Sequence, residues 1–209
     1  MYTVFGFSTQ NTLKVLYVLE QLGLNYEFNY VNLMKGEQKD PSFQKINPVG
    51  KTPVLVHDGQ SLFESGAICR YLANVETSDL YPVPAMKRAK VDQWMDYFTC
   101  HLGRWLNELN YQYVIKKMAG RGEPDMNTVE EARTFVFAQA GIVNGWLEKN
   151  TYLCGDSLTI ADLFAFAYVE QAKAVHVDLS PYPALVAWHD RLEALPSVQN
   201  ARTRLRSYA

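Results

Sequence analysis

Glu64 and Ser65 stand where a predicted strand meets a predicted helix, and their side chains could form an anion-binding site. A hydroxyl group beside the free backbone N–H groups of a helix N-terminus can bind a carboxylate or a phosphate. Ser65 could instead only cap the helix, a role that contributes about 1 kcal/mol to stability. The residue pattern by itself leaves both roles open.

Cysteine and histidine, the usual nucleophiles and metal ligands, are few and scattered in this chain. The three cysteines, Cys69, Cys100 and Cys154, form no CxxC pair, and the four histidines have no metal-ligand spacing. We therefore expect no metal site and no disulfide framework. A reduced, cytoplasmic protein is the simplest interpretation.

The elements that must position Glu64 and Ser65 follow from the spacing of the apolar residues. Helical spacing predicts one helix through residues 15–22, ended by Gly23, and another at 65–73. Four short strands are predicted at residues 2–7, 26–31, 53–57 and 61–63, the last two joined by an Asp58-Gly59 turn. This order implies a small mixed sheet, since the first connection is a crossover and the last is a hairpin.

After residue 76 the strand signals nearly vanish. Residues 77–84 contain two prolines in three residues and are predicted to be a linker. Helical periodicity then predicts helices at 87–118, at 129–149, from Thr159 onward with a capping box, and at 184–194. The sequence therefore predicts an α+β protein with a mixed domain at 1–76 and an all-helical domain at 85–209.

The composition is that of an ordinary globular protein. Of the 209 residues, 48% are apolar and 20% charged, so a disordered or low-complexity chain is excluded. The formal net charge of −2 gives no basic footprint for nucleic acid. No run approaches the ~20 consecutive apolar residues of a membrane helix. We expect neither nucleic acid nor a membrane as a partner.

Four segments together resemble the cytosolic glutathione transferase family over essentially the whole chain. They are VFGFSTQNTLKV at 4–15, NPVGKTPVL at 47–55, LFESGAICRYL at 62–72 and SLTIAD at 157–162. One segment alone would be weak, but their order and spacing make the match specific. The resemblance implies a thioredoxin-like N-terminal domain, an all-helical C-terminal domain, glutathione as co-substrate and usually a homodimer.

The resemblance also implies a set of glutathione-binding residues, Lys39, Lys51, Thr52, Pro53, Val54, Glu64 and Ser65. In the family the peptide bond before the residue matching Pro53 is cis, which turns the adjacent backbone toward the extended tripeptide. Glu64 and Ser65 would bind its γ-glutamyl end. Lys39 and Lys51 are candidates for its glycyl carboxylate. A solvated surface lysine is the alternative for both, and it would explain Lys39 equally well.

Thr9 is the residue that the resemblance assigns to activation of the thiol, with Asn11 as a supporting donor and Ser8 as the second choice. Thr9 matches the serine of the phi- or theta-like classes, and Thr9 with Asn11 matches the Thr-x-Asn pattern of the bacterial nu-like class. A thiol with a pKa near ~8.5 is only a few per cent ionised at pH 7, so a donor is needed. Thr9 or Asn11 could instead only cap the first helix.

A second substrate would need an apolar pocket, and an aromatic stripe is the candidate for its wall. Its members recur at helical spacing on one predicted helix, at Trp94, Tyr97, Phe98, His101 and Trp105. Tyr97, His101 and Trp105 are the predicted pocket residues for a hydrophobic electrophile. Such a stripe is more often part of a core or a dimer interface, so these alternatives stay open.

The expected function is therefore that of a glutathione transferase, which conjugates glutathione to hydrophobic electrophiles, with peroxide reduction as a further activity. A glutathione-dependent disulfide-bond reductase of the nu-like type is the enzymatic alternative, and it would use bound glutathione rather than a protein cysteine. A non-catalytic binding module of the same fold is the third hypothesis. The polar loop at residues 8–12 and the Glu64-Ser65 pair favour an enzyme.

Overall fold

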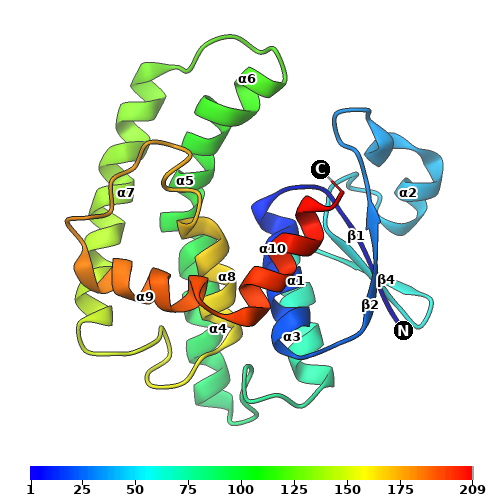
Figure 1. The fold of residues 1–209 in the computed structure, drawn as a ribbon, viewed down its shortest axis with the longest axis horizontal. Coiled ribbons are helices and arrows are strands. Elements are labelled where there is room, and N and C mark those ends of the chain that lie inside the picture. The colour runs from blue at the N-terminus through cyan, green and yellow to red at the C-terminus, as the bar shows by residue number, and fades with distance from the viewer. Residues whose placement is uncertain (209) are drawn as a thin grey trace. The chain divides into compact units, whose positions relative to one another are not determined.

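The computed structural model describes residues 1–208, which form two compact units (Figure 1). One unit contains Met1–Tyr81 together with the chain from Ala194 onward, and the other is Pro82–Glu193. The first holds a small mixed sheet with helices, and the second is helical. This confirms the predicted fold class.

The sheet in the described residues has the strand order β2-β1-β3-β4. Strand β1 (Tyr2–Gly6) runs parallel to β2 (Tyr26–Tyr30) and antiparallel to β3 (Val54–His57), which pairs with β4 (Gln60–Phe63). Asp58 and Gly59 join β3 to β4 with φ of 49° and 77°, as a tight hairpin turn requires. The predicted crossover between β1 and β2 and the predicted hairpin between β3 and β4 are confirmed.

Helices α1 (Gln10–Gln21) and α3 (Ser65–Val75) supply much of the core of the first unit and pack against each other. Val15, Leu16 and Leu19, three of the apolar residues that predicted α1, are completely buried, and the helix ends just before Gly23, whose φ is +67°. A short 3₁₀ turn (Glu37–Lys39) leads into α2 (Pro41–Ile46), which the sequence analysis did not predict. With six residues and one buried side chain, Phe43, α2 has too little periodicity to be recognised.

The last helix, α10 (Pro196–Arg206), corrects the predicted domain limits, because it belongs to the first unit. It packs along α1, where Ser197 Oγ donates to Gln21 Oε1 at 2.7 Å (Figure 1). Val198, Ala201 and Leu205 form its buried face at helical spacing. The predicted helical domain at 85–209 therefore includes a segment that packs on the sheet-containing unit.

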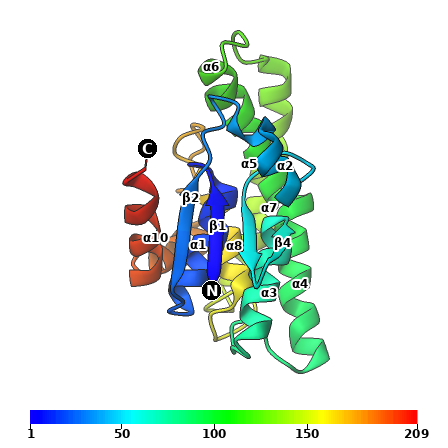
Figure 2. The same ribbon diagram turned by 90° about the vertical axis from the view of Figure 1, so that its right-hand side faces the viewer.

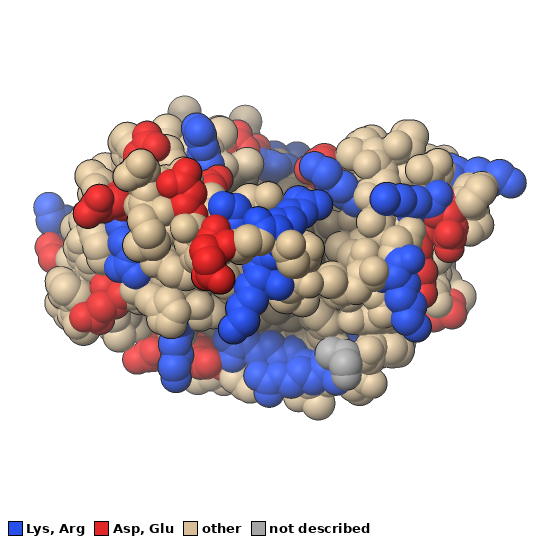
Figure 3. Space-filling model, turned by 90° about the horizontal axis from the view of Figure 1, so that it is seen from above, with Lys and Arg blue, Asp and Glu red and all other residues tan. Residues whose placement is uncertain are grey.

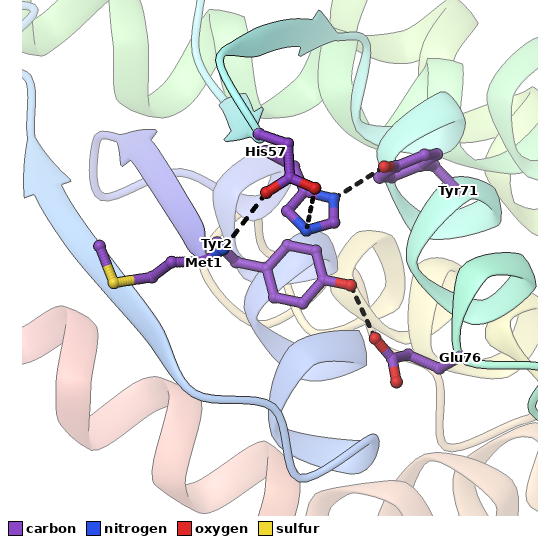
Figure 4. A network of polar contacts seen from close by, with 6 residues as sticks. Met1, Tyr2, His57, Tyr71 and Glu76 are labelled. Carbon is purple, nitrogen blue, oxygen red and sulfur yellow. Dashed lines mark hydrogen bonds and ion pairs between the residues drawn. The ribbon is translucent and has the colours of Figure 1, made fainter.

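A network of polar contacts ties the start of β1 and the end of β3 to α3 (Figure 4). Tyr2 donates its hydroxyl to Glu76 Oε1 at 2.7 Å, and its ring lies 4.1 Å from the ring of His57. His57 Nδ1 in turn lies 2.8 Å from the hydroxyl of Tyr71. Burial and the Glu76 carboxylate raise the pKa of Tyr2, so this phenol stays protonated and structural.

The helical unit comprises α4 (Ala85–Cys100), α5 (Leu102–Asn110), α7 (Met126–Leu147), α8 (Ile160–Val169) and α9 (Pro183–Glu193). A π-helical turn (Tyr111–Ile115) and α6 (Lys116–Met118) extend α5. All ten residues of α8 are buried, which places this helix at the centre of the unit. None of the helices in residues 1–208 is long and apolar enough to cross a membrane.

The single helix predicted at 87–118 is wrong, because the chain breaks at His101 with φ −121° and ψ −98°. The reason is a close approach at Gly103. A Cβ atom there would lie 2.4 Å from the Phe98 carbonyl oxygen and 2.7 Å from the Tyr168 ring. Only glycine allows α5 to pack so tightly against α8, and the backbone bends to bring it there.

The predicted capping box at the start of α8 is present and centres on Asp162, which is completely buried. Its Oδ1 accepts hydrogen bonds from Leu153 N (2.8 Å) and Trp188 Nε1 (3.0 Å). Its Oδ2 accepts from Thr159 N (2.9 Å) and Thr159 Oγ1 (3.0 Å). Burial raises the pKa of Asp162, and the four hydrogen-bond donors oppose this rise. Through these hydrogen bonds the carboxyl group connects α8, α9 and the loop before α8.

Candidate functional site

The strand register brings three loops to one end of the sheet, which Figure 2 shows with its strands side by side. Phe5 in β1 is opposite Val54 in β3, and Val54 is opposite Phe63 in β4. The segments that follow β1, precede β3 and follow β4 therefore leave the sheet at the same end. Most of the predicted glutathione and thiol residues lie on these three segments.

Thr9 begins α1 as its N-cap, with φ −133° and ψ 156°. Its Oγ1 accepts a hydrogen bond from Thr12 N at 3.4 Å and lies 3.3 Å from Thr12 Oγ1. Phe7 N donates to the same Thr12 hydroxyl at 3.3 Å. The capping role is thus present, and it leaves the Thr9 hydroxyl hydrogen free for a ligand whenever Thr12 donates to Thr9.

Ser8 and Asn11 flank this cap. Ser8 is exposed in the loop, while Asn11 is half-buried in the first turn of α1. Asn11 Oδ1 accepts a hydrogen bond from Lys14 Nζ at 2.8 Å. The sequence analysis treated Lys14 only as part of a matching segment. The contact between Lys14 and Asn11 could have been predicted from their spacing, because residues three apart in a helix are neighbours and Lys14 falls among the buried residues of α1.

The loop before β3 is held in shape by Asn47, which is only 1% exposed. Its Nδ2 donates to the carbonyl oxygen of Lys51 at 2.7 Å, and its Oδ1 accepts from Val49 N at 3.0 Å. Gly50 has φ +65° and lies against the backbone of Gln38, at 3.4 Å from the position of a Cβ. This contact brings the segment with Lys39 beside the loop with Lys51, and both lysines are exposed.

The Thr52–Pro53 peptide bond is cis, as the family resemblance implied. Val54 is completely buried and is paired in the sheet with Phe5 on one side and Phe63 on the other. Thr52 is half-buried and precedes the strand. The backbone groups of Thr52 therefore lie outside the strand ladder, whereas those of Val54 lie within it.

Glu64 is the N-cap of α3, and Ser65 is its first residue. The Glu64 side chain makes no capping hydrogen bond, and Ser65 is the first helical residue rather than the N-cap position from which side chains usually cap a helix. Glu64 has φ 69° and ψ 111°, a left-handed conformation that costs a non-glycine residue about 1–3 kcal/mol. Backbone strain of this kind is typical of functional sites.

The predicted pocket residues do not lie on one helix, because Tyr97 is on α4, Trp105 is on α5 and His101 joins them. Tyr97 donates its hydroxyl to Gln139 Oε1 at 2.7 Å, and burial raises its pKa to about 12. Trp105 instead stacks on Phe135, with ring centres 4.5 Å apart.

Tyr97 lines a groove of about 440 Å³ between α4 and α7. Its apolar wall consists of Trp94, Tyr97, Ile142 and Trp146. His101 and Trp105 are not part of this wall, so the structure does not gather the three predicted residues into this groove. The aromatic stripe is divided because the helix breaks at His101.

Two of the cysteines are poor nucleophiles in this structure. Burial raises the pKa of Cys69 to about 12 and that of Cys154 to about 11, so both thiols are protonated near neutral pH. His189, Asp190 and Glu193 bring ligand atoms within 4.8 Å of one another on α9, a cluster that the sequence analysis did not identify. These groups also pair with one another, with His189 Nδ1 3.2 Å from Asp190 Oδ1.

Charged side chains of both signs are present on the face shown in Figure 3, and the formal net charge of the chain is only −2. Binding of an anionic ligand must therefore rely on local groups rather than on the field of the whole protein. In the first unit these local groups are Lys39, Lys51 and the N-termini of α1 and α3.

Comparison with known proteins gives consistent matches over nearly the full length. The family models described as "Glutathione S-transferase, N-terminal domain" and "Glutathione S-transferase, C-terminal domain" match residues 1–74 and 100–196. Glutathione S-transferase 3 of Zea mays is 32% identical, covering 90% of this chain and 87% of the relative. The disulfide-bond oxidoreductase YfcG of Escherichia coli is 31% identical, covering 92% and 90%. A solved glutathione S-transferase-I with bound lactoylglutathione has a TM-score of 0.88 at 30% identity, covering 96% and 97%.

Proposed function

Because the chain belongs to the glutathione S-transferase family, we propose that it is an enzyme that binds glutathione and activates its thiol at the end of the sheet described above. The observation that carries the proposal is the strand register, which brings the start of α1, the Thr52–Pro53 step and the start of α3 together. An extended tripeptide needs groups for two charged ends and for one thiol, and these three segments offer them.

The γ-glutamyl end of glutathione carries a carboxylate and an ammonium group. The carboxylate would bind the Ser65 hydroxyl and the uncapped backbone N–H groups of α3, where the helix dipole favours a negative charge. The ammonium group would pair with the Glu64 carboxylate. The strained backbone of Glu64 supports this role, because strain persists where the surrounding structure holds a functional group in place.

The backbone of Thr52 would hydrogen-bond to the cysteinyl residue of glutathione, since Thr52 lies outside the ladder that engages Val54. Lys51 and Lys39 would attract the glycyl carboxylate at the other end. Asn47 fixes the Lys51 backbone, while the long lysine side chains remain free to adjust. We expect Lys51 to contribute more, because its loop is held directly by Asn47.

The thiol would lie at the N-terminus of α1 and bind the Thr9 hydroxyl and the Asn11 carboxamide. Lowering its pKa by two units needs about 2.7 kcal/mol of preferential stabilisation of the thiolate. A helix N-terminus supplies about 0.3–1 kcal/mol, and a hydrogen bond to a charged acceptor supplies about 1.5–3 kcal/mol. A hydrogen-bond donor at the N-terminus of α1 combines the effect of the helix dipole with that of the hydrogen bond. Ser8 is the second choice because it is exposed and lies outside the helix.

We propose conjugation as the main reaction. The thiolate sulfur forms a bond to an electrophilic carbon. In a substitution a leaving group departs with the electrons of its bond, and in an addition to an activated alkene the C=C π bond breaks and the neighbouring carbon takes up a proton. The aromatic residues Tyr97 and Trp105 and the adjacent His101 remain candidates for contacts with a hydrophobic electrophile. Peroxide reduction would use the same thiolate, with a second glutathione releasing oxidised glutathione. A homodimer is the proposed assembly, since it is typical of the family.

Glutathione-dependent disulfide reduction is the second candidate. The likeness to the protein named disulfide-bond oxidoreductase and the Thr9-x-Asn11 pattern favour it. Bound glutathione thiolate would attack the disulfide, and a second glutathione would resolve the mixed disulfide, giving oxidised glutathione and two thiols. The raised pKa values of Cys69 and Cys154 support a mechanism in which the attacking thiolate comes from glutathione.

The decisive experiment is the ultraviolet difference spectrum of glutathione with the purified protein across pH. A thiolate that forms well below the pKa of free glutathione would support binding and activation. Initial rates with an activated haloarene and with a small dialkyl disulfide then separate the two enzymatic candidates, and light scattering gives the assembly. Absence of glutathione binding would refute the proposal and favour a non-catalytic binding module.

A further inference from the structure

Lys14 is a buried lysine in the helix that begins at the proposed thiol site. It lies in the second turn of α1, and the residue is 0% exposed. Burial of an ammonium group is costly unless the group is paired. A cation near a helix N-terminus is also disfavoured by the helix dipole. A lysine in such a position points to a specific local role.

The contacts of Lys14 lead to two parts of the proposed site. Its ammonium group donates to Asn11 Oδ1, with Nζ and Oδ1 2.8 Å apart. Its backbone carbonyl oxygen accepts a contact from Cys69 Sγ at 3.5 Å, where α1 packs on α3. Burial lowers the pKa of Lys14, while the electrostatic interactions with Cys69 and then with Glu64 oppose this effect. The Lys14 side chain therefore contacts Asn11, and its backbone packs against Cys69 of α3.

The chemistry of the two groups fixes the orientation of the Asn11 carboxamide. Lys14 Nζ donates to Asn11 Oδ1, so the oxygen of the amide is the side that faces the lysine. The NH₂ group of Asn11 then faces away from the ammonium group and remains a donor for a ligand. This orientation matters, because a thiolate binds the NH₂ group but is repelled by Oδ1.

We propose that Lys14 is a positioning residue, which holds the Asn11 carboxamide so that its NH₂ group faces the sulfur of bound glutathione. The inference rests on the proposed thiol chemistry of Thr9 and Asn11. Lys14 does not touch the ligand itself, since it is fully buried. Without it, the carboxamide can rotate by half a turn and lose the preference for the thiolate.

The test is a double-mutant cycle with Lys14→Met and Asn11→Ala, read by the pKa of the bound glutathione thiol. We expect Lys14→Met to raise this pKa by about one unit, a tenfold loss of thiolate below the pKa. In the Asn11→Ala background, the same Lys14→Met change should have no further effect, because the two residues act as a unit. Binding of S-methylglutathione, which has no ionisable thiol, should be unchanged in all variants.

The outcomes separate the inference from the function on which it rests. If the wild-type protein binds no glutathione, both the proposed function and the inference fail. If Lys14→Met folds and the bound glutathione thiol keeps its wild-type pKa, only the inference is overturned. Additive effects in the cycle also overturn it, since Lys14 would then act by its charge and not through Asn11. Leu19→Ala is the matched packing control in α1, and it should lower the melting temperature without changing the thiol pKa.

A wild-type measurement keeps the inference testable even if Lys14→Met does not fold. The side-chain NH₂ signal of Asn11 can be assigned by its loss in Asn11→Ala and then followed by NMR as glutathione is added. We expect this signal to shift with formation of the thiolate and to stay unchanged with S-methylglutathione. An NH₂ signal that does not respond to the thiolate would overturn the inference.

Discussion

Replacement of Thr9 by valine separates its two roles, the helix cap and the proposed thiol donor. Valine keeps the shape of threonine but removes the hydroxyl, which caps Thr12 N and would donate to the thiolate. The capping distance of 3.4 Å is longer than the usual ~2.9–3.0 Å, so this bond is weak. We therefore expect a loss of only about 0.5–1 kcal/mol of stability, the lower end of the range for N-caps.

The expected effect of Thr9→Val on the thiol is larger than its effect on stability. Loss of one hydrogen bond to a charged sulfur costs about 1.5–3 kcal/mol, which raises the thiol pKa by about 1–2 units. The assay is the pH titration of thiolate absorbance with glutathione bound. The rate with an activated haloarene, measured below this pKa, should fall about tenfold or more because less thiolate is present.

Two control variants make the Thr9 prediction specific. Thr9→Ser keeps the hydroxyl and should keep both the cap and the thiol pKa near wild type. Asp125→Ala removes the N-cap of α7, where Asp125 Oδ1 accepts from Asn127 N at 3.0 Å, and should affect only the melting temperature. An unchanged thiol pKa in folded Thr9→Val would refute the assignment of Thr9 and direct attention to Ser8.

Three further predictions follow from other parts of the structure. Ser65→Ala should weaken glutathione binding about tenfold, measured by calorimetry, with little change in melting temperature because Ser65 is not the cap of α3. Asp162→Asn should lower the free energy of unfolding in urea by about 2–4 kcal/mol, since an NH₂ group would face buried donors; a loss below 1 kcal/mol would contradict this. Burial lowers the pKa of Lys14 below its unfolded value of about 10.4, so the unfolded chain takes up the proton first as pH falls. The stability of the wild type relative to Lys14→Met should therefore increase as the pH rises towards the unfolded pKa of about 10.4, and a flat difference would contradict the burial of this lysine.

The elements that carry the site were predictable because their local signals agree with their tertiary packing. The Asp58-Gly59 turn and the apolar spacing of α1 gave the hairpin and the crossover, and both appear in the structure. The cis bond before Pro53 followed from the family resemblance alone, since most X-Pro bonds are trans. The crossover and the hairpin gave the relative directions within two pairs of strands. The antiparallel pairing of β1 with β3, which brings the loops together, was not predicted from the sequence.

Other features depend on contacts between distant residues, which local patterns do not reveal. The break at His101 arises from the packing of Gly103 on Tyr168, 65 residues further along the chain. Helix α10 was missed because its arginines mask the spacing of its few apolar residues. The aromatic stripe was predicted on one helix, but the break at His101 divides it between α4 and α5.

The proposed site also explains why two energetically unfavourable residues lie so close to each other along the packed helices α1 and α3. Glu64 has a left-handed backbone, and Lys14 has a buried ammonium group under the influence of that same carboxylate. Neither feature is needed to form the sheet or to bury the apolar face of α1, which other residues achieve. Each can be offset by binding, since Glu64 would pair with the ligand ammonium and Lys14 would orient Asn11 toward the thiolate. Local frustration of this kind is expected at a functional site, and here it converges on two groups of one ligand, its γ-glutamyl ammonium group and its thiol.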